Sequence, residues 1–252
     1  TCYAQNYVAN HSFESMYACP NGSAQIDSCI GWTSYGSSPD YFDTCGAIGF
    51  NVPDNFIGWQ PAFDGNGCTD VITYSKSDNT REYLGTELIN PLKIGNKYFV
   101  SCYVCRANDF THNAASNNFG FRFFNESFSV NNPCPTDNFA HIHTSNLITD
   151  SVNWTKIEGS FIADSAYRYL SIGNFFDDQH TDTVGVYSPS TVFKYAQYYV
   201  DYVCVSEDSL FNCDLPVIST SNIDVDEKID ITIKNALGIL TINSPINHSY
   251  FE

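Results

Sequence analysis

Short runs of alternating apolar and polar residues, separated by turn-forming residues, constrain this chain more than any other feature. Residues 119–124, FGFRFF, place three phenylalanines on one side of a predicted strand and Arg122 on the other. No segment carries a helical period over three turns. Many short strands divided by Gly, Pro and Asn predict an all-β, jelly-roll β-sandwich. The other predicted strands are 7–14, 70–74, 81–88, 97–105, 141–144, 154–163, 167–174 and 198–205.

Composition and charge limit the partners of such a domain. The 17 Tyr and 19 Phe against a single Met favour strands over helices. The formal net charge of −17 repels nucleic acid and anionic membranes. It suits a neutral ligand such as a sugar, or a bound cation, although solubility alone also accounts for it. No apolar stretch of about 18 residues is present, so no membrane span is predicted.

Ten cysteines indicate an oxidising compartment. They are dispersed rather than grouped at the spacing of zinc ligands, so we predict disulfides. Cys102 is left as a buried free thiol. The four expected pairs are Cys19–Cys29, Cys45–Cys68, Cys105–Cys134 and Cys204–Cys213.

The chain is predicted to divide into three parts. Residues 1–4 look like the remnant of a signal peptide, with an ordinary N-terminus as the alternative. Residues 5–214 hold all the predicted strands of the jelly roll. Aromatic residues are then almost absent, so residues 215–252 are interpreted as a linker and a short β-rich tail.

Five motifs follow one another in the jelly-roll region. They are NYVANHSFE at 6–14, GW at 31–32, LKIGNKYFVS at 92–101, NWTKIEGSF at 153–161 and YVDYV at 199–203. Together they resemble the carbohydrate-binding modules of families four and nine, which have a galactose-binding-like jelly roll. The resemblance covers residues 6–205 and implies a secreted binding module for carbohydrate or adhesion.

A second set of segments consists of CPNG at 19–22, CIGW at 29–32, PDYF at 39–42, REY at 81–83 and IGNF at 172–175. These segments are similar to a variety of this domain in bacterial surface proteins exported by the type IX secretion system. Residues 231–242 resemble the start of a type IX sorting domain, but lack the prolines that usually flank its asparagine. The resemblance implies a cell-surface location and contact with the type IX export machinery.

The resemblance also implies a structural calcium ion where the first and last strands meet. Its ligands would be the carboxylates of Glu14 and Asp201, completed by Asn10, because calcium prefers hard oxygen ligands. Tyr202 stands where the family usually has a second acid. The alternative is that solvent or backbone amides satisfy both carboxylates.

Sugar sites combine an aromatic platform with a few directed polar groups. If Leu84 and Leu88 face the core, the alternation of residues 81–88 turns the intervening side chains outward. Other candidates stand beside phenylalanines or in loops, although most aromatic residues must belong to the core. The candidate ligand-binding residues are Tyr41, Trp59, Arg81, Tyr83 and Arg122.

Two other functions remain open from the sequence. His141 and His143 share one face of a predicted strand and suit a metal-dependent jelly-roll enzyme, but Leu147 stands where cupins place a glutamate. A structural surface protein that assembles through protein–protein contacts is the other alternative. We take a non-catalytic binding module as the first hypothesis.

Overall fold

A computed structural model describes residues 6–76, 79–109, 111–185 and 195–209, and the backbone of two short strands beyond them. The chain divides into two compact units, Thr1–Leu215 and Pro216–Glu252. The division falls where the composition changes. The predicted signal-peptide remnant and Cys213 lie outside the described residues.

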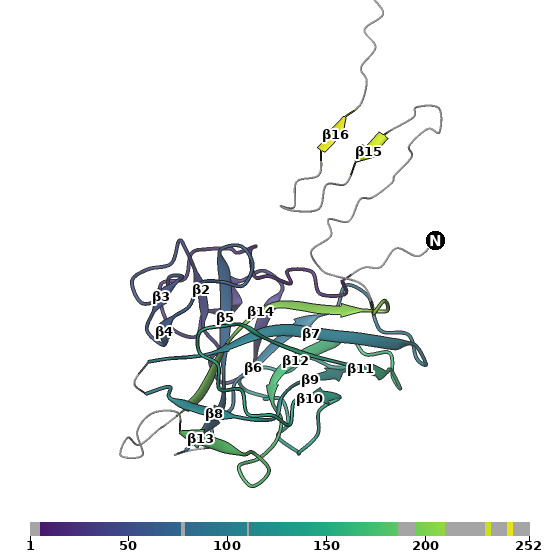
Figure 1. The fold of residues 1–252 in the computed structure, drawn as a ribbon. Helices are drawn as coiled ribbons and strands as arrows, with labels where there is room; N and C mark the ends of the chain where they lie inside the picture. Colours follow the sequence, from purple (N-terminus) through teal and green to yellow (C-terminus); the bar gives the residue numbers. More distant parts are fainter. Residues whose placement is uncertain are drawn as a thin grey trace, which may run out of the picture. The chain divides into compact units, whose positions relative to one another are not determined.

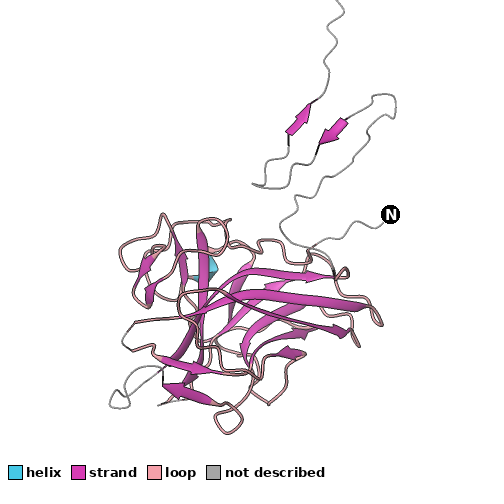
Figure 2. Ribbon diagram, in the orientation of Figure 1, coloured by secondary structure: helices cyan, strands magenta, loops and turns pink. Residues whose placement is uncertain are grey.

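The first unit is built from two five-stranded antiparallel sheets (Figures 1 and 2). Side chains of both sheets contribute to one main core, so the predicted all-β sandwich is confirmed. Sheet I has the order β1 (Trp32–Gly36), β6 (Tyr83–Glu87), β12 (Tyr169–Asn174), β9 (Phe119–Phe124), β10 (Ile142–His143). Sheet II has the order β11 (Thr155–Ile162), β7 (Lys97–Arg106), β14 (Tyr195–Ser206), β5 (Gly67–Ser75), β2 (Tyr41–Asp43).

Smaller elements complete the described structure. A single 3-10 helix, η1 (Ile26–Ser28), is found among the described residues. None of the described helical residues forms an apolar segment long enough to cross a membrane. The remaining strand pairs are β3 (Asp54–Asn55) with β4 (Gly58–Trp59), β8 (Ala114–Ser116) with β13 (Thr183–Gly185), and β15 (Asp230–Thr232) with β16 (Thr241–Asn243).

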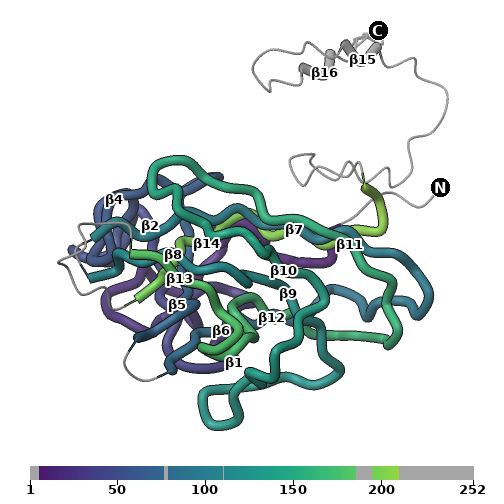
Figure 3. Tube along the Cα trace, turned by 60° about the horizontal axis from the view of Figure 1, so that its bottom comes forward, coloured from purple at the N-terminus to yellow at the C-terminus, as the bar shows by residue number. Residues whose placement is uncertain are grey.

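The alternation of β9 decides what sheet I presents on each face. Phe119, Phe121 and Phe123 are buried in the main core, as predicted, whereas Arg122 and Phe124 point to the outer face. Figure 3 shows β9 between β10 and β12. Strand geometry thus carries residues of opposite character to opposite sides of one sheet.

The segment of residues 125–141 covers part of the outer face of sheet I. Its backbone is anchored where Cys134 N–H donates to Tyr35 O at 2.7 Å and Asn138 N–H donates to Phe175 O at 2.9 Å. Under it lies a second apolar cluster that includes Tyr35, Cys134 and Phe175. Strand alternation alone would leave the outer face of sheet I in solvent, and residues 125–141 therefore cover part of it.

The N-terminal segment forms no strand, contrary to the prediction for residues 7–14. It nevertheless lies beside β14, because Tyr7 N–H donates to Val205 O and Val203 N–H donates to His11 O, each at 2.8 Å. Two isolated backbone hydrogen bonds, and two more between the Asn6 side chain and the backbone of Val203 and Val205, hold it without a continuous ladder. The expected meeting of first and last segments is retained.

Three predicted disulfides are wrong. Cys19 is bonded to Cys45, with 5.6 Å between their Cα atoms, and both lie at the surface. Their predicted partners, Cys29 and Cys68, are buried free thiols. The third predicted pair, Cys105 and Cys134, is also unbonded, and Cys102 is free as expected. Cys204 is disulfide-bonded, but its predicted partner is outside the described residues. Among the cysteines that the structure describes, the free ones are Cys29, Cys68, Cys102, Cys105 and Cys134.

Candidate functional site

A surface cavity of about 440 Å³ lies where β9 meets the segment that covers sheet I. This volume falls in the range of small-ligand sites in proteins. Five of its eight lining residues carry aromatic rings. We call it the aromatic pocket, lined by Arg122, Phe123, Phe124, Asn125, Glu126, Phe139, His141 and Tyr167.

Arg122 is fixed in place by the segment that covers its strand. Its guanidinium forms a two-pronged ion pair with Asp137, whose Oδ2 accepts from Nη2 at 2.9 Å. Nη1 also donates to Phe139 O at 3.1 Å. The charged group lies 5.0 Å from the ring centroid of Phe124 and 5.2 Å from that of Phe139, which are cation–π distances. The ion pair lowers the pKa of Asp137.

His141 and Tyr167 form one wall of the pocket through a short chain of hydrogen bonds. Phe123 N–H donates to His141 Nδ1 at 3.2 Å, which leaves the proton on Nε2, 3.2 Å from the Tyr167 hydroxyl. That hydroxyl donates to Asp164 Oδ1 at 2.6 Å. Burial lowers the pKa of His141 to about 4, so the ring is neutral at pH 7. The chain holds both rings in one orientation.

The remaining polar groups of the pocket are mostly acceptors. The amide of Asn125 donates one N–H to Ser165 Oγ at 2.8 Å, and its oxygen accepts from no residue that the structure describes. Glu126 is exposed and makes no ion pair or hydrogen bond with any residue that the structure describes. Phe139, which is 49% exposed, adds an open ring beside them. Aromatic surface next to directed acceptors is the combination that binds a sugar ring.

Sequence reasoning found only part of this pocket. Arg122 and His141 were singled out for different hypotheses, and the structure brings them together. Phe139 and Glu126 were missed, because residues 125–140 are rich in turn residues and carry no strand period. The one sequence signal for the pocket was Phe139 itself, an aromatic residue two positions before His141.

Tyr41 and Tyr83 were predicted to bind ligand, but both side chains are buried. The Tyr41 hydroxyl donates to Phe13 O at 2.8 Å within the main core. Tyr83 does leave the main core, as the alternation required, but it stacks on Phe175 with 5.2 Å between ring centroids. The direction of its side chain was right, and the covering segment was not foreseen.

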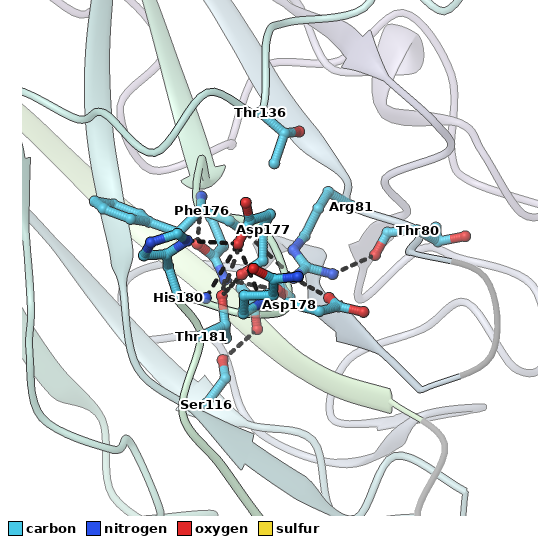
Figure 4. A network of polar contacts seen from close by, with 12 residues as sticks. Thr80, Arg81, Ser116, Thr136, Phe176, Asp177, Asp178, His180 and Thr181 are labelled. Atoms are coloured by element: carbon cyan, nitrogen blue, oxygen red, sulfur yellow. Dashed lines mark hydrogen bonds and ion pairs between the residues drawn. The ribbon is translucent and has the colours of Figure 1, made fainter.

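Arg81 is also structural rather than ligand-binding. Its side chain is 3% exposed, and Nη2 donates to Asp178 Oδ1 at 2.7 Å and to Phe176 O at 3.3 Å. Figure 4 shows the guanidinium within the network that holds residues 176–181. Asp177 accepts a hydrogen bond from the Asn138 amide at 3.0 Å and has His180 Nδ1 at 2.7 Å, and these contacts lower its pKa to about 2. Arg81 therefore attaches this loop to the start of β6.

Trp59 is exposed, as predicted, but it does not line the aromatic pocket. It stands on the β3–β4 hairpin with 58% of its surface exposed. Its backbone N–H donates to Asn108 Oδ1 at 3.0 Å, which ties the hairpin to the residues after β7. It is a separate exposed ring, useful as a comparison for Phe139.

His141 and His143 do not form the metal pair that the enzyme hypothesis needs. Both ring nitrogens of His141 have partners, as described above, and the ring of His143 lies 4.8 Å from that of Phe176. No group of three or more His, Cys, Asp or Glu side chains among the described residues is arranged to hold a metal ion. The pair is part of the aromatic packing around β10.

Glu14 and Asp201 bind the two halves of one loop, residues 61–67. Asp201 Oδ2 accepts the backbone N–H groups of residues 63–64 at 2.8 and 3.1 Å. Glu14 Oε1 accepts those of residues 66–67 at 2.8 and 2.9 Å. Burial raises the pKa of Asp201, and the two N–H donors oppose that shift. Backbone amides therefore satisfy both carboxylates.

Asn10 is committed to a turn of its own. Its Nδ2 donates to Ser15 O at 2.8 Å and to Ile30 O at 2.9 Å, and its Oδ1 accepts from Ser15 N–H at 3.1 Å. The amide oxygen thus already accepts one hydrogen bond within this turn. All three predicted calcium ligands offer oxygen, but each is held by hydrogen bonds of its own.

Comparison with protein-family models finds no match, and comparison with curated proteins finds none either. Among solved structures, a Clostridium thermocellum xylanase with CBM22-1 and GH10 modules, complexed with xylohexaose, is 12% identical (TM-score 0.42), over 82% of this chain and 30% of that one. A Stig cyclase from Fischerella is 13% identical with a TM-score of 0.45, over 81% of this chain and 98% of that one. The K1 cleaved adhesin domain of Lys-gingipain from Porphyromonas gingivalis is 14% identical with a TM-score of 0.41, over 81% of this chain and 98% of that one. Likenesses this remote transfer no ligand or activity.

Proposed function

We propose that this domain is a secreted, non-catalytic module that binds carbohydrate, or mediates adhesion through it, at the aromatic pocket. The observation that carries the proposal is an open cavity in which aromatic rings stand beside free oxygen acceptors. A sugar ring offers an apolar face for stacking and a rim of hydroxyl donors. The fixed positions of Arg122 and His141 keep the pocket in shape without a ligand.

Replacement of Phe139 by alanine tests the site. We expect affinity for a glycan selected on an array to fall about tenfold, because truncating a contact ring commonly costs more than 1 kcal/mol. Trp59→Ala, which removes an exposed ring outside the pocket, is the matched control and should bind as wild type does. Isothermal titration calorimetry measures both, with circular dichroism to verify folding.

Two results would count against this function. If Trp59→Ala weakens binding and Phe139→Ala does not, the ligand sits elsewhere. If no glycan binds, with or without calcium, assembly through protein–protein contacts becomes the better hypothesis. Analytical ultracentrifugation would then measure self-association.

Export to the cell surface by the type IX system is part of the proposal. The Cys19–Cys45 disulfide supports an oxidising location. The route itself rests on the sequence resemblance, including residues 231–242. Surface labelling of cells with and without a working type IX system tests it, and equal surface amounts in both would reject the route.

A calcium ion at Glu14 and Asp201 is also proposed from the resemblance. Support comes from two carboxylates that flank one loop, although a cation must replace N–H donors at both. We expect about 1 mM calcium to raise the unfolding temperature by a few degrees over EDTA, because an ion bound only to the folded state stabilises it. Glu14→Gln should lose this gain. Identical unfolding temperatures for wild type in both buffers would exclude the ion.

A further inference from the structure

The aromatic pocket holds one cationic side chain, and its charge is already matched. The Arg122 guanidinium is paired with Asp137 through two hydrogen bonds and is bound to Phe139 O by a third. Such a two-pronged pair is strong and directional. An anionic ligand would have to break it to gain a contact with Arg122.

The other charges around the pocket are negative. Glu126 lines it with a free carboxylate, and Asp164 stands behind the wall, bonded to the Tyr167 hydroxyl. His141 is neutral at pH 7. Arg168, the residue after Tyr167, directs its guanidinium to Glu87 at 2.8 Å. The pocket thus has a surplus of negative charge.

Its hydrogen-bonding capacity has the same bias. Tyr167 already donates its hydroxyl proton to Asp164, and the Asn125 amide donates to Ser165. The groups left for a ligand are mainly the oxygens of Asn125 and Glu126, which accept, with the second N–H of the Asn125 amide as a neutral donor. A carboxylate, sulfate or phosphate group offers acceptors alone, so most of its oxygens would face acceptors and the Glu126 carboxylate.

A cationic ligand is disfavoured for a different reason. The faces of Phe124 and Phe139 already lie 5.0 and 5.2 Å from the Arg122 guanidinium. A second cation on these rings would meet the first at close range. The remaining ligand class is one that is neutral and rich in hydroxyl donors.

We infer that the aromatic pocket selects neutral glycans over uronic-acid and sulfated ones, and that Glu126 is the side chain that determines this selectivity. The inference rests on the proposed function. Glu126 would favour neutral ligands in two ways, because its carboxylate accepts hydrogen bonds from sugar hydroxyls and repels a ligand anion. Its exposed position leaves the fold independent of its charge.

The test compares one neutral oligosaccharide that binds with its counterpart in which a C6 hydroxymethyl group is oxidised to a carboxylate. Wild type should bind the neutral form about tenfold more tightly at low salt, and less selectively at high salt, where the charges are screened. Glu126→Gln should weaken binding of the neutral form, because the side chain contacts the sugar, and should lose most of the discrimination between the two forms. Glu126→Lys should prefer the acidic form.

Asp54→Lys is the matched control, because it makes the same charge change on the exposed edge of β3. It should retain the wild-type preference. If wild type binds the acidic form as tightly as the neutral one, or if Glu126→Lys discriminates as wild type does, the selectivity is overturned while the binding function stands. Absence of binding to every glycan rejects the function itself.

Discussion

The domain is expected to unfold at a temperature about 5 °C higher at about pH 5 than at about pH 8, against the usual preference for neutral pH. The reason is a buried cluster of three carboxyl groups, Asp40, Asp70 and Glu82. No lysine or arginine within the described ranges forms an ion pair with any of them. Ionising the cluster in the folded protein therefore carries an uncompensated cost.

The cluster joins elements from both sheets. Asp40, directly before β2, donates its N–H to Asp70 Oδ1 on β5 at 2.8 Å. Glu82, directly before β6, accepts from Ile72 N–H at 2.9 Å and from Ser38 Oγ at 3.1 Å. These contacts hold the edge of sheet II against the start of a strand of sheet I. Charge repulsion here acts where the two layers meet.

The sign of the pH dependence follows from the direction of the shifts. Burial raises the pKa of Asp40 to about 6 and that of Glu82 to about 7, and burial with the two neighbouring acids raises the pKa of Asp70. Between about pH 4 and pH 7 the folded protein holds protons that the unfolded chain has released, so stability falls as pH rises. Two kinds of group act in the opposite direction. Carboxylates with lowered pKa, such as Asp177, do so below about pH 4, and His141 does so between about pH 4 and pH 6.5, so the fall in stability is steepest above about pH 6.

Asp70→Asn should flatten the profile and stabilise the protein at about pH 8 by about 2 kcal/mol, a typical effect of removing a buried polar group whose burial is not fully compensated. The side-chain amide of Gln197 donates to Asp70 Oδ2, and its own oxygen is buried without a partner among the described atoms. After rotation of that amide, the new asparagine can donate to this oxygen.

Denaturant unfolding across the pH range measures these stabilities. The exposed Asp54→Asn serves as the control and should follow wild type. A wild-type stability that rises from pH 5 to 8 would contradict the prediction, as would an Asp70→Asn protein with an unchanged slope.

The contrast between these carboxyl groups and the phenylalanines of β9 shows what the sequence could predict. Strand alternation depends on a residue and its near neighbours, so the inward faces of residues 119–124 and of Leu84 and Leu88 were predicted correctly. The burial of Asp70 depends on segments that meet it from 30 and more residues away. No local pattern marks such an acid as different from a solvated one.

The same limit explains the ligand site. Tyr83 and Arg122 were directed to the outer face of sheet I, and both are there. Which of them remains open depends on the path of residues 125–141, which carry no period. Cysteine pairing failed for a related reason, because Cys29 and Cys68 are close in sequence to plausible partners but point into the interior. Strand periodicity predicts the direction in which a side chain points. Whether another segment covers that side chain depends on long-range contacts.

Gly85→Ala is expected to cost about 3 kcal/mol of stability, at the upper end of overpacking effects, because the strand has no room for a side chain there. Gly85 lies in β6, and a Cβ atom added to it would lie 2.2–2.3 Å from three ring atoms of Tyr35. That ring is buried in the second cluster beneath residues 125–141, so it cannot swing away into solvent. Gly22→Ala, whose Cβ would meet only ordinary contacts from 3.5 Å, is the matched control and should change stability by less than about 1 kcal/mol.

A double-variant cycle with Tyr35→Ala shows whether the loss comes from this contact. Tyr35→Ala alone should destabilise the protein by leaving a cavity in the second cluster. Gly85→Ala added to that background should cost little further, because the atoms it would strike are gone and the new methyl group fills part of the space. If the two costs simply add, the clash is not the cause, and the Tyr35 ring does not pack on Gly85 as described. If they do not add, the loss comes from the close packing of the Tyr35 ring on a strand that has no side chain at this position.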